Sequence, residues 1–130
     1  MIIPNKLIKL EYDPTKDILV VEWPDFAYYS LPQLHHILDN IIETIRHYDI
    51  SYLMLDARTT VITISQDDYD TIAQKFIKDL MKTRIKKVAR LSTEDFEREK
   101  QVDEIKDDPR VTISIKSFST VDEALDWFKT

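Results

Sequence analysis

The same start signal for a helix recurs along this sequence. Ser30, Ser65, Ser92 and Thr120 each precede a stretch with helical character, and each is followed three residues later by Gln, Asp or Glu. In this arrangement the hydroxyl accepts a hydrogen bond from a first-turn amide, and the later side chain can reach back to the amide of the capping residue. Apolar residues then recur at helical spacing, most clearly after Ser30 and Ser65, whereas the stretch after Ser92 is highly charged. The pattern predicts a helix after each of these positions, the third of them exposed.

The stretches between these helices favour strands. Residues 6–12 alternate apolar and polar side chains, and a turn joins them to residues 18–23, so the two read as a hairpin. Residues 52–56 begin with a continuous apolar run, which is typical of a strand covered on both faces. Residues 87–91 and 111–118 alternate. Helices and strands therefore alternate along most of the chain.

This order of elements predicts an α/β fold of the ββαβαβαβα kind. Right-handed strand–helix–strand connections give a mainly parallel sheet of five strands, with an antiparallel first strand at or near an edge. The polar positions within residues 111–118 indicate that one face of the sheet is only partly covered, so the helices are expected mostly on the other. We expect residues 1–130 to form a single domain of ordinary size.

Composition excludes several classes of site. The sequence has no glycine, which a P-loop, a dinucleotide-binding turn and a nucleophile elbow all require at positions where a Cβ atom would clash. It also has no cysteine, so thiolate catalysis, thiolate metal sites and disulfides are excluded. His35 and His36 are adjacent on a predicted helix and point in different directions, and His47 lies near its far end, where a cation offsets the helix dipole. We therefore expect no metal site, no cofactor and no catalytic residue.

The charge balance points away from nucleic acid. The formal net charge is −6, whereas binding to phosphates needs a basic surface. No apolar stretch approaches the roughly 20 residues that span a bilayer, and residues 1–6 lack the pattern of a signal peptide. We expect a cytoplasmic protein without an integral membrane segment.

Two long connectors are predicted to hold the functional site. Residues 23–29 and 56–65 follow strands of the parallel sheet, and ligands of such sheets bind beyond the carboxyl ends of the strands. The first connector is aromatic and could cover an apolar ligand, whereas the second is polar. The candidate binding residues of the two connectors are Trp23, Phe26, Tyr28, Tyr29, Asp56, Arg58 and Thr59.

Each candidate also has a purely structural explanation. Aromatic residues after a strand often close the end of a core, and Asp56 and Arg58 can simply hold each other. Ser65 is the candidate phosphorylation site, and its alternative is an N-cap. The sequence leaves these alternatives open.

At this point the chain resembles STAS-type domains, and in particular the SpoIIAA-like, or STAS/SEC14 domain-containing, family. The resemblance extends over residues 7–128 and implies the same α/β fold. Its most telling stretches are Tyr52-Leu53-Met54-Leu55-Asp56-Ala57-Arg58, Val88-Ala89-Arg90 and Val121-Asp122-Glu123-Ala124-Leu125-Asp126-Trp127-Phe128.

The resemblance implies a domain that is not an enzyme. Anti-sigma-factor antagonists of this kind bind a partner kinase and are switched by serine phosphorylation, whereas the SEC14-like side implies a lipophilic small molecule. Asp56 matches the acidic residue that ends the central strand in the family pattern. The family's Asp-Ser-Ser-Gly turn is replaced near residues 64–68, where there is no glycine and Ser65 alone carries a hydroxyl.

We therefore predict a non-catalytic regulatory or protein-interaction module that can pair as a homodimer. The alternative is a carrier or sensor of a lipophilic small molecule, with an aromatic lid at residues 23–29. The partly covered sheet face or the third helix is the expected contact surface, because an open apolar area favours association.

Overall fold

The described residues form one six-stranded sheet and four helices. The computed structural model describes residues 1–5, 8–24, 29–60, 63–92 and 96–130, apart from the side chains of residues 96–98. The strands are β1 (Ile2–Ile3), β2 (Leu10–Asp13), β3 (Ile18–Glu22), β4 (Tyr52–Asp56), β5 (Lys87–Leu91) and β6 (Ser114–Phe118). The helices are α1 (Leu31–Tyr48), α2 (Gln66–Leu80), α3 (Phe96–Lys106) and α4 (Val121–Phe128).

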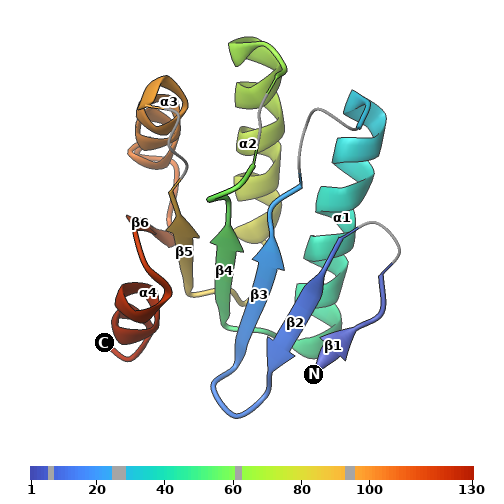
Figure 1. The fold of residues 1–130 in the computed structure, drawn as a ribbon, viewed down its shortest axis with the longest axis vertical. Coiled ribbons are helices and arrows are strands. Elements are labelled where there is room, and N and C mark those ends of the chain that lie inside the picture. The colour runs from blue at the N-terminus through green and yellow to red at the C-terminus, as the bar shows by residue number, and fades with distance from the viewer. Residues whose placement is uncertain (6–7, 25–28, 61–62, 93–95) are drawn as a thin grey trace.

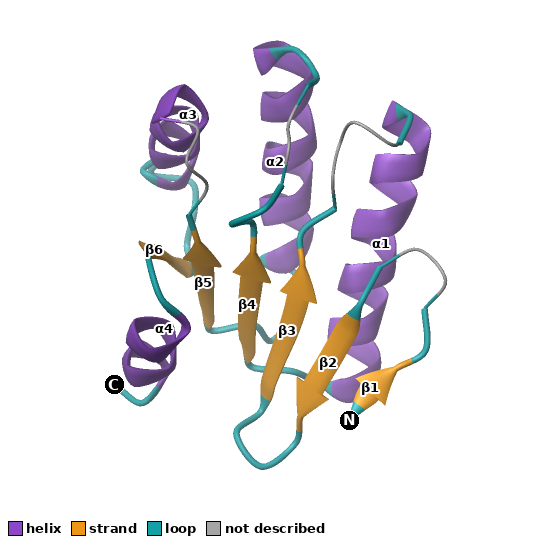
Figure 2. Ribbon diagram, viewed as in Figure 1, coloured by secondary structure: helices purple, strands orange, loops and turns teal. Residues whose placement is uncertain are grey.

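The strands lie side by side in the order in which they occur in the sequence (Figures 1 and 2). β1 and β2 pair antiparallel, as do β2 and β3, and the pairs from β3 to β6 are parallel. From β3 onward, each strand–helix–strand connection places the next strand on the same side of the preceding one. Right-handed crossovers that step in one direction leave their helices on one face, which accounts for α1, α2 and α3 sharing a core. α4 follows β6 and packs on the opposite face.

The predicted fold class is confirmed. The elements occur in the expected order. The sheet begins with antiparallel strands and continues with parallel ones, and most helices lie on one face, as the sequence and the resemblance to STAS-type domains implied. The number of strands was wrong, because β1 adds a sixth strand at the edge of the sheet beyond β2. Several boundaries also differ: β2 extends over Leu10–Asp13, β3 ends at Glu22, and β6 begins at Ser114, after a turn in which Val111 N donates to Asp108 O.

Three of the expected helix caps are present. Ser30 accepts from Gln33 N, and Gln33 Oε1 in turn accepts from Ser30 N at 2.8 Å, which completes the reciprocal box. Ser65 and Thr120 accept from the third residue of their helices, but the Thr120 hydroxyl donates to the Glu123 carboxylate, so the reciprocal backbone bond expected there is replaced. Ser92 N donates to Phe118 O at 3.0 Å, and the residues that its side chain was expected to cap lie outside the described part of the chain.

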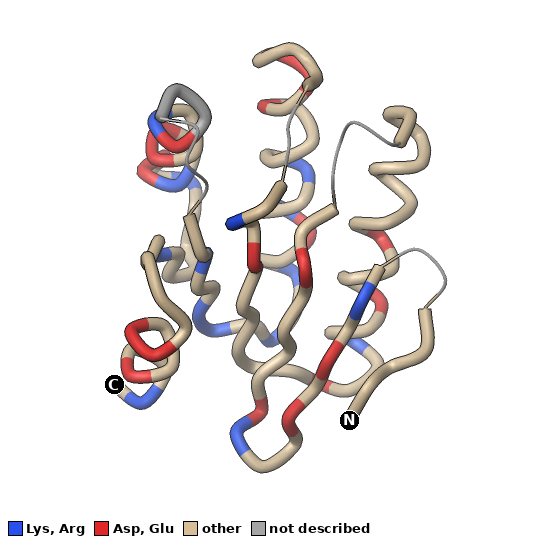
Figure 3. The backbone as a smooth tube through the Cα atoms, in the orientation of Figure 1, with Lys and Arg blue, Asp and Glu red and all other residues tan. Residues whose placement is uncertain are grey.

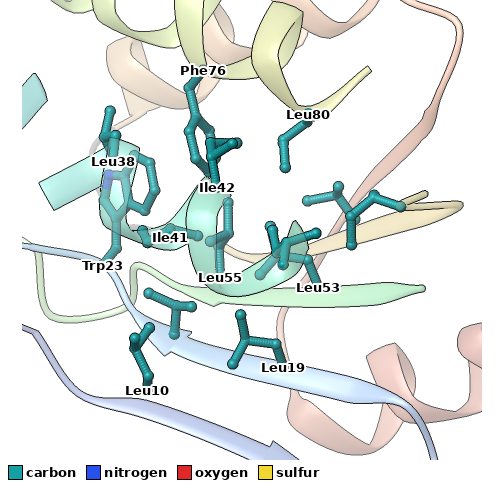
Figure 4. Packing of buried hydrophobic residues seen from close by; sticks show 14 of the residues in the cluster. Leu10, Leu19, Trp23, Leu38, Ile41, Ile42, Leu53, Leu55, Phe76 and Leu80 are labelled. Carbon is teal, nitrogen blue, oxygen red and sulfur yellow. The ribbon is translucent and has the colours of Figure 1, made fainter. Parts of the chain in front are cut away.

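The main core lies between the sheet and α1, α2 and α3 (Figure 4). Alternation along the strands sends Leu53 and Leu55 into this core and Met54 into the smaller cluster beneath α4. Each buried Leu or Ile contributes roughly 1.5–3 kcal/mol relative to an exposed one. Burial on both faces of β4 explains why its sequence is continuously apolar. None of the helices formed by the described residues is long and apolar enough to cross a membrane.

Candidate functional site

The four parallel strands end side by side at one edge of the sheet. Glu22, Asp56, Leu91 and Phe118 are register neighbours across β3 to β6. Pairing continues beyond the strand ends, since Trp23 N donates to Asp56 O at 2.8 Å. The Thr60 hydroxyl also donates to the Trp23 carbonyl oxygen at 3.1 Å. The connectors that follow β3 and β4 therefore leave the sheet next to each other.

The aromatic connector contributes to the core. Trp23 is 8% exposed, and its ring lies 5.5 Å from the ring of Phe76 on α2, measured between centroids (Figure 4). Tyr29 is half-buried against the same core. Phe26 and Tyr28, the other aromatic candidates, lie outside the described residues. Trp23 therefore has the structural role that the sequence left open, and it closes the end of the core beside Phe76.

The polar connector holds a two-point ion pair. Arg58 Nε and Nη2 donate to the two carboxylate oxygens of Asp56 at 3.0 and 2.9 Å, and Arg58 N donates to the same carboxylate. The side chains are 27% exposed for Asp56 and 46% for Arg58. The hydrogen bonds from Arg58 lower the pKa of Asp56, against the opposing effect of partial burial. Asp56 is thus held ionised, and Thr59 beside the pair is exposed.

Ser65 lies at the N-terminus of α2. Its hydroxyl accepts from Asp68 N at 3.1 Å, and the side chain is exposed. Asp67 and Asp68 occupy the first turn of the helix. A phosphate at this position would meet the favourable end of the helix dipole and also two nearby carboxylates, so its electrostatic effects oppose each other.

A buried charge on β5 was missed from the sequence. Arg90 is 6% exposed and forms an ion pair with Glu99 of α3. Burial disfavours the charged guanidinium, but the hydrogen bond to Glu99 and the neighbouring Tyr69 outweigh it, so the pKa of Arg90 is raised. The signal was present in the alternation, since Arg90 shares a strand face with Val88, which lies in the main core. The pair ties β5 to α3 and leaves neither charge free for chemistry.

The second feature is a groove on the opposite face of the sheet; the sequence predicted a partly covered face but not the groove itself. α4 packs against β5 and β6 and covers only part of this face. Beside it lies an open-face groove of about 380 Å³. The groove is lined by Met1, Glu11, Tyr12, Asp13, Pro14, Lys16, Ile18, Val20, Met54, Asp56, Leu91, Val121 and Leu125. The half-buried apolar side chains of Val20, Val121 and Leu125 are the part of this lining that a bound molecule would cover.

Carboxylates gather around this groove. Glu11 and Asp13 come from β2 and Asp56 from β4, and Glu22 lies beside Asp56 in register on the same face. Figure 3 shows the acidic positions of β2, β3 and β4 next to one another. The alternation along β2 could have located the carboxylates of Glu11 and Asp13. These residues alternate with core residues and must therefore lie on the other face of the sheet.

A larger surface groove of about 1220 Å³ lies between α2 and α3. Its lining mixes charges of both signs, such as Asp70 and Glu104 with Lys75 and Lys100. Gln101 Nε2 crosses it to donate to Gln66 O at 2.7 Å. Within the described part of the chain, no group of three or more His, Asp and Glu side chains could hold a metal ion.

Comparison with known proteins adds little to this geometry. No protein-family model matches the sequence, and no curated protein matches it. The fold is similar to a chain in the crystal structure of diguanylate cyclase SiaD in complex with its activator SiaC from Pseudomonas aeruginosa. The TM-score is 0.43 and the sequence identity 15%, and the match covers 91% of this chain and 99% of that chain. A likeness this distant assigns no role to any residue here.

Proposed function

We propose that this protein is a non-catalytic interaction module that binds a partner protein in the open-face groove. The observation that carries the proposal is the uneven covering of the sheet. Among the described residues, three helices share the core on one face, whereas α4 is the helix that packs on the other and leaves Val20, Val121 and Leu125 half-buried beside a groove. Covering such apolar surface stabilises a complex.

The polar groups at the strand ends support a binding role over a catalytic one. Asp56 and Arg58 neutralise each other through two hydrogen bonds. Two of the nearby hydroxyls are also engaged, since Thr60 donates to a backbone carbonyl and Ser65 caps α2, whereas Thr59 is exposed. A nucleophile needs a free hydroxyl within reach of a base. These groups instead fix the shape of the edge next to the groove.

The carrier of a lipophilic molecule is the less favoured reading. It requires aromatic side chains that cover an enclosed apolar space. Trp23 packs on Phe76 and Tyr29 packs against the main core, so the described aromatic residues of that connector fill space themselves.

Site-specific photo-crosslinking tests the proposed surface. A benzophenone amino acid replaces Glu22, which is exposed on the groove face, or, as a matched control, Glu43, which is exposed on α1. We expect the Glu22 position, in the native cells of this protein, to form a covalent adduct with a specific protein that the Glu43 position does not form. Equal adducts from both positions, or none from Glu22, would contradict the proposal.

Homodimer formation stays a separate prediction. Light scattering at micromolar concentration measures it directly. Two copies that met through their groove faces would bring Glu11 and Glu22 of each against the carboxylates of the other, which is unfavourable. We expect any dimer to leave the crosslinking pattern from Glu22 unchanged.

A further inference from the structure

We infer that α3 is a lid over the carboxyl ends of β5 and β6, and that it detaches as a unit while the rest of the chain stays folded. This inference is independent of the proposed function, because α3 packs on the main core and the open-face groove lies on the other face of the sheet. It follows from the contacts that hold α3, from the polar groups beneath it and from the connector that follows it.

α3 has little apolar surface against the core. Ile105 is buried and Val102 is half-buried, and the other described side chains of the helix are half-buried or exposed polar groups. The neighbouring helix α2, by comparison, buries large side chains at helical spacing, namely Tyr69, Ile72, Phe76 and Leu80. Burial of apolar surface is the main force that holds a helix on a sheet. α3 is therefore held less firmly than α2.

The polar contacts of α3 orient it more than they hold it. Glu99 pairs with Arg90 of β5, and Gln101 Nε2 donates to Gln66 O of α2 at 2.7 Å. Both charges of a buried pair lose their water, and this loss offsets much of the attraction between them. When α3 leaves the sheet, both Glu99 and Arg90 regain water. Separating the two charges together therefore costs much less than removing one of them from the closed state.

Two buried polar groups at this end of the sheet favour opening. Arg90 and Ser117 are register neighbours on β5 and β6, so their side chains lie on the same face. Arg90 Nη2 and Ser117 Oγ are both buried, and neither has a hydrogen-bond partner among the residues that the structure describes. A buried polar group without a partner is unfavourable relative to the same group in water. Detachment of α3 lets water reach both groups, which lowers the cost of opening.

The connector after α3 provides a hinge. In the described chain, the hydrogen bonds of residues 107–111 stay within residues 103–111. The next residue makes the first bond to another element, since Thr112 N donates to Met81 Sδ at 3.4 Å, and Ile113 then packs against the main core. A segment with local bonds can absorb the change in backbone dihedral angles that moves a helix. The hinge therefore lies before Thr112.

The rest of the fold keeps its own contacts when α3 leaves. β5 stays paired with β4 and with β6, and α2 lies between α1 and α3 and retains its buried side chains (Figure 1). Opening would expose the guanidinium of Arg90 and the hydroxyl of Ser117, beside the half-buried Ile115 of β6. α3 thus controls access to a cation that the closed molecule buries.

Native-state hydrogen exchange on the full chain tests the detachment. After correction for intrinsic rates, we expect the backbone amides of α3 to exchange about tenfold or more faster than those of α1 and β4. Their exchange should also depend less on added urea, because opening of one helix exposes less surface than global unfolding. Equal protection and equal urea dependence in all three elements would show that α3 opens only with the whole molecule, which would overturn the inference.

Three variants separate the lid from global unfolding. Ile41→Val, at a position of α1 that is 0% exposed, should accelerate the exchange of α1 and β4 by about fivefold and leave that of α3 within about twofold. Glu99→Ala leaves Arg90 buried without its carboxylate only while α3 is closed, so the exchange of α3 should rise by about a hundredfold or more. Glu104→Ala, at an exposed position of the same helix, is the matched control and should leave α3 within about twofold.

Two results from these variants would contradict the lid. One is equal acceleration of α1 and α3 by Ile41→Val, since a detachable α3 does not depend on the core of α1. The other is an equal effect of Glu99→Ala and Glu104→Ala on α3, since only Glu99 contacts the residue that the lid buries.

A thiol probe tests whether opening uncovers the strand beneath α3. The sequence has no cysteine, so Ser117→Cys introduces a single thiol of similar size beside Arg90. We expect the thiol reagent DTNB to label this variant slowly, and about a hundredfold faster when Glu99→Ala is added. Circular dichroism establishes that each variant is folded. Faster exchange of α3 without faster labelling of the thiol would mean that the helix unwinds in place, and the inference would be wrong.

Discussion

Arg90 of β5 and Glu99 of α3 form an ion pair inside the molecule, where the arginine side chain is 7% exposed and the glutamate 19%. α3 is otherwise rich in charged residues, and Val102 and Ile105 are its described apolar contacts with the main core. A helix with so little apolar surface depends on specific polar contacts to stay in place. The pair therefore contributes to the position of α3.

Removing Glu99 should destabilise the protein strongly. Glu99→Ala leaves a buried guanidinium without its carboxylate, and breaking a buried pair in this way costs roughly 3–5 kcal/mol. Urea denaturation measures the loss. Arg90→Met is the informative comparison, because it removes the buried charge itself and leaves the more exposed Glu99 able to reach water. We expect Arg90→Met to be the milder variant, and the opposite ranking would contradict this account of the pair.

The raised pKa of Tyr12 predicts how the stability of the protein changes in alkaline solution. Its hydroxyl donates to Asp17 Oδ1 at 2.7 Å, and this bond together with burial raises the pKa of Tyr12 from 10.0 to about 12. The raised pKa favours the folded state while the phenol is protonated, so this contribution is complete below pH 10 and is lost as pH rises to about 12.

The variant Tyr12→Phe isolates that contribution. It should cost about 1 kcal/mol at neutral pH through loss of the hydrogen bond. Its stability should then fall less steeply than that of the unmodified protein between pH 10 and 12. Parallel slopes in the two proteins over that range would show that Tyr12 does not titrate abnormally.

Two aspartates should titrate below their usual range. Arg110 donates to both carboxylate oxygens of Asp108 and lowers its pKa from 3.8 to about 2, and Arg58 lowers the pKa of Asp56 in the same manner. Carboxyl chemical shifts in NMR report these values directly. We expect Arg110→Ala to return the pKa of Asp108 toward 3.8 and leave that of Asp56 unchanged. Arg58→Ala should do the reverse.

These pairs stabilise the folded protein only while the aspartates are ionised. A lowered pKa means that the contribution is present above about pH 4 and is lost as pH falls further. Because the Asp56–Arg58 pair is solvent-exposed, Arg58→Ala should change the free energy of unfolding by at most about 1 kcal/mol at neutral pH.

The helix caps give a direct test of the role of Ser65. Ser30→Ala and Ser65→Ala each remove a hydroxyl that accepts from a first-turn amide, and each should cost about 1 kcal/mol. Ser65→Asp retains an acceptor at the N-cap and should stay within about 0.5 kcal/mol of the unmodified protein. Ser119→Ala, at an exposed serine that directly precedes a cap, is the control and should be nearly neutral. A neutral effect of Ser65→Ala would contradict the capping role.

Most of the fold could be predicted because the local signals agree with one another. Ser30, Ser65 and Thr120 mark the helix starts through bonds made within a single turn, and those bonds form in the structure. The alternation near β2 indicated which of its side chains face the core, and the apolar run of β4 indicated that this strand is covered on both faces. β1 was missed because two residues are too short to show a period, and they pair only because β2 offers its free edge.

The candidate site was predicted less well. The sequence indicated that the connectors after β3 and β4 begin at the same edge of the sheet. Trp23 N indeed donates to Asp56 O at that edge. It could not decide whether Trp23 covers a ligand or fills the core, because that depends on Phe76, which is distant in the sequence and adjacent in space. The groove was not identified from the sequence, since its walls come from β2 and from α4 at the other end of the chain.

The sequence by itself determined the identity and order of the elements, because capping and side-chain periodicity act over a few residues. Only the tertiary structure decided which face of the sheet α4 would cover, that Arg90 would meet Glu99, and that four carboxylates would border one apolar groove. Those features arise from the directions of the connections between the strands and from the packing of α4 after β6. Neither can be read from any local stretch of residues.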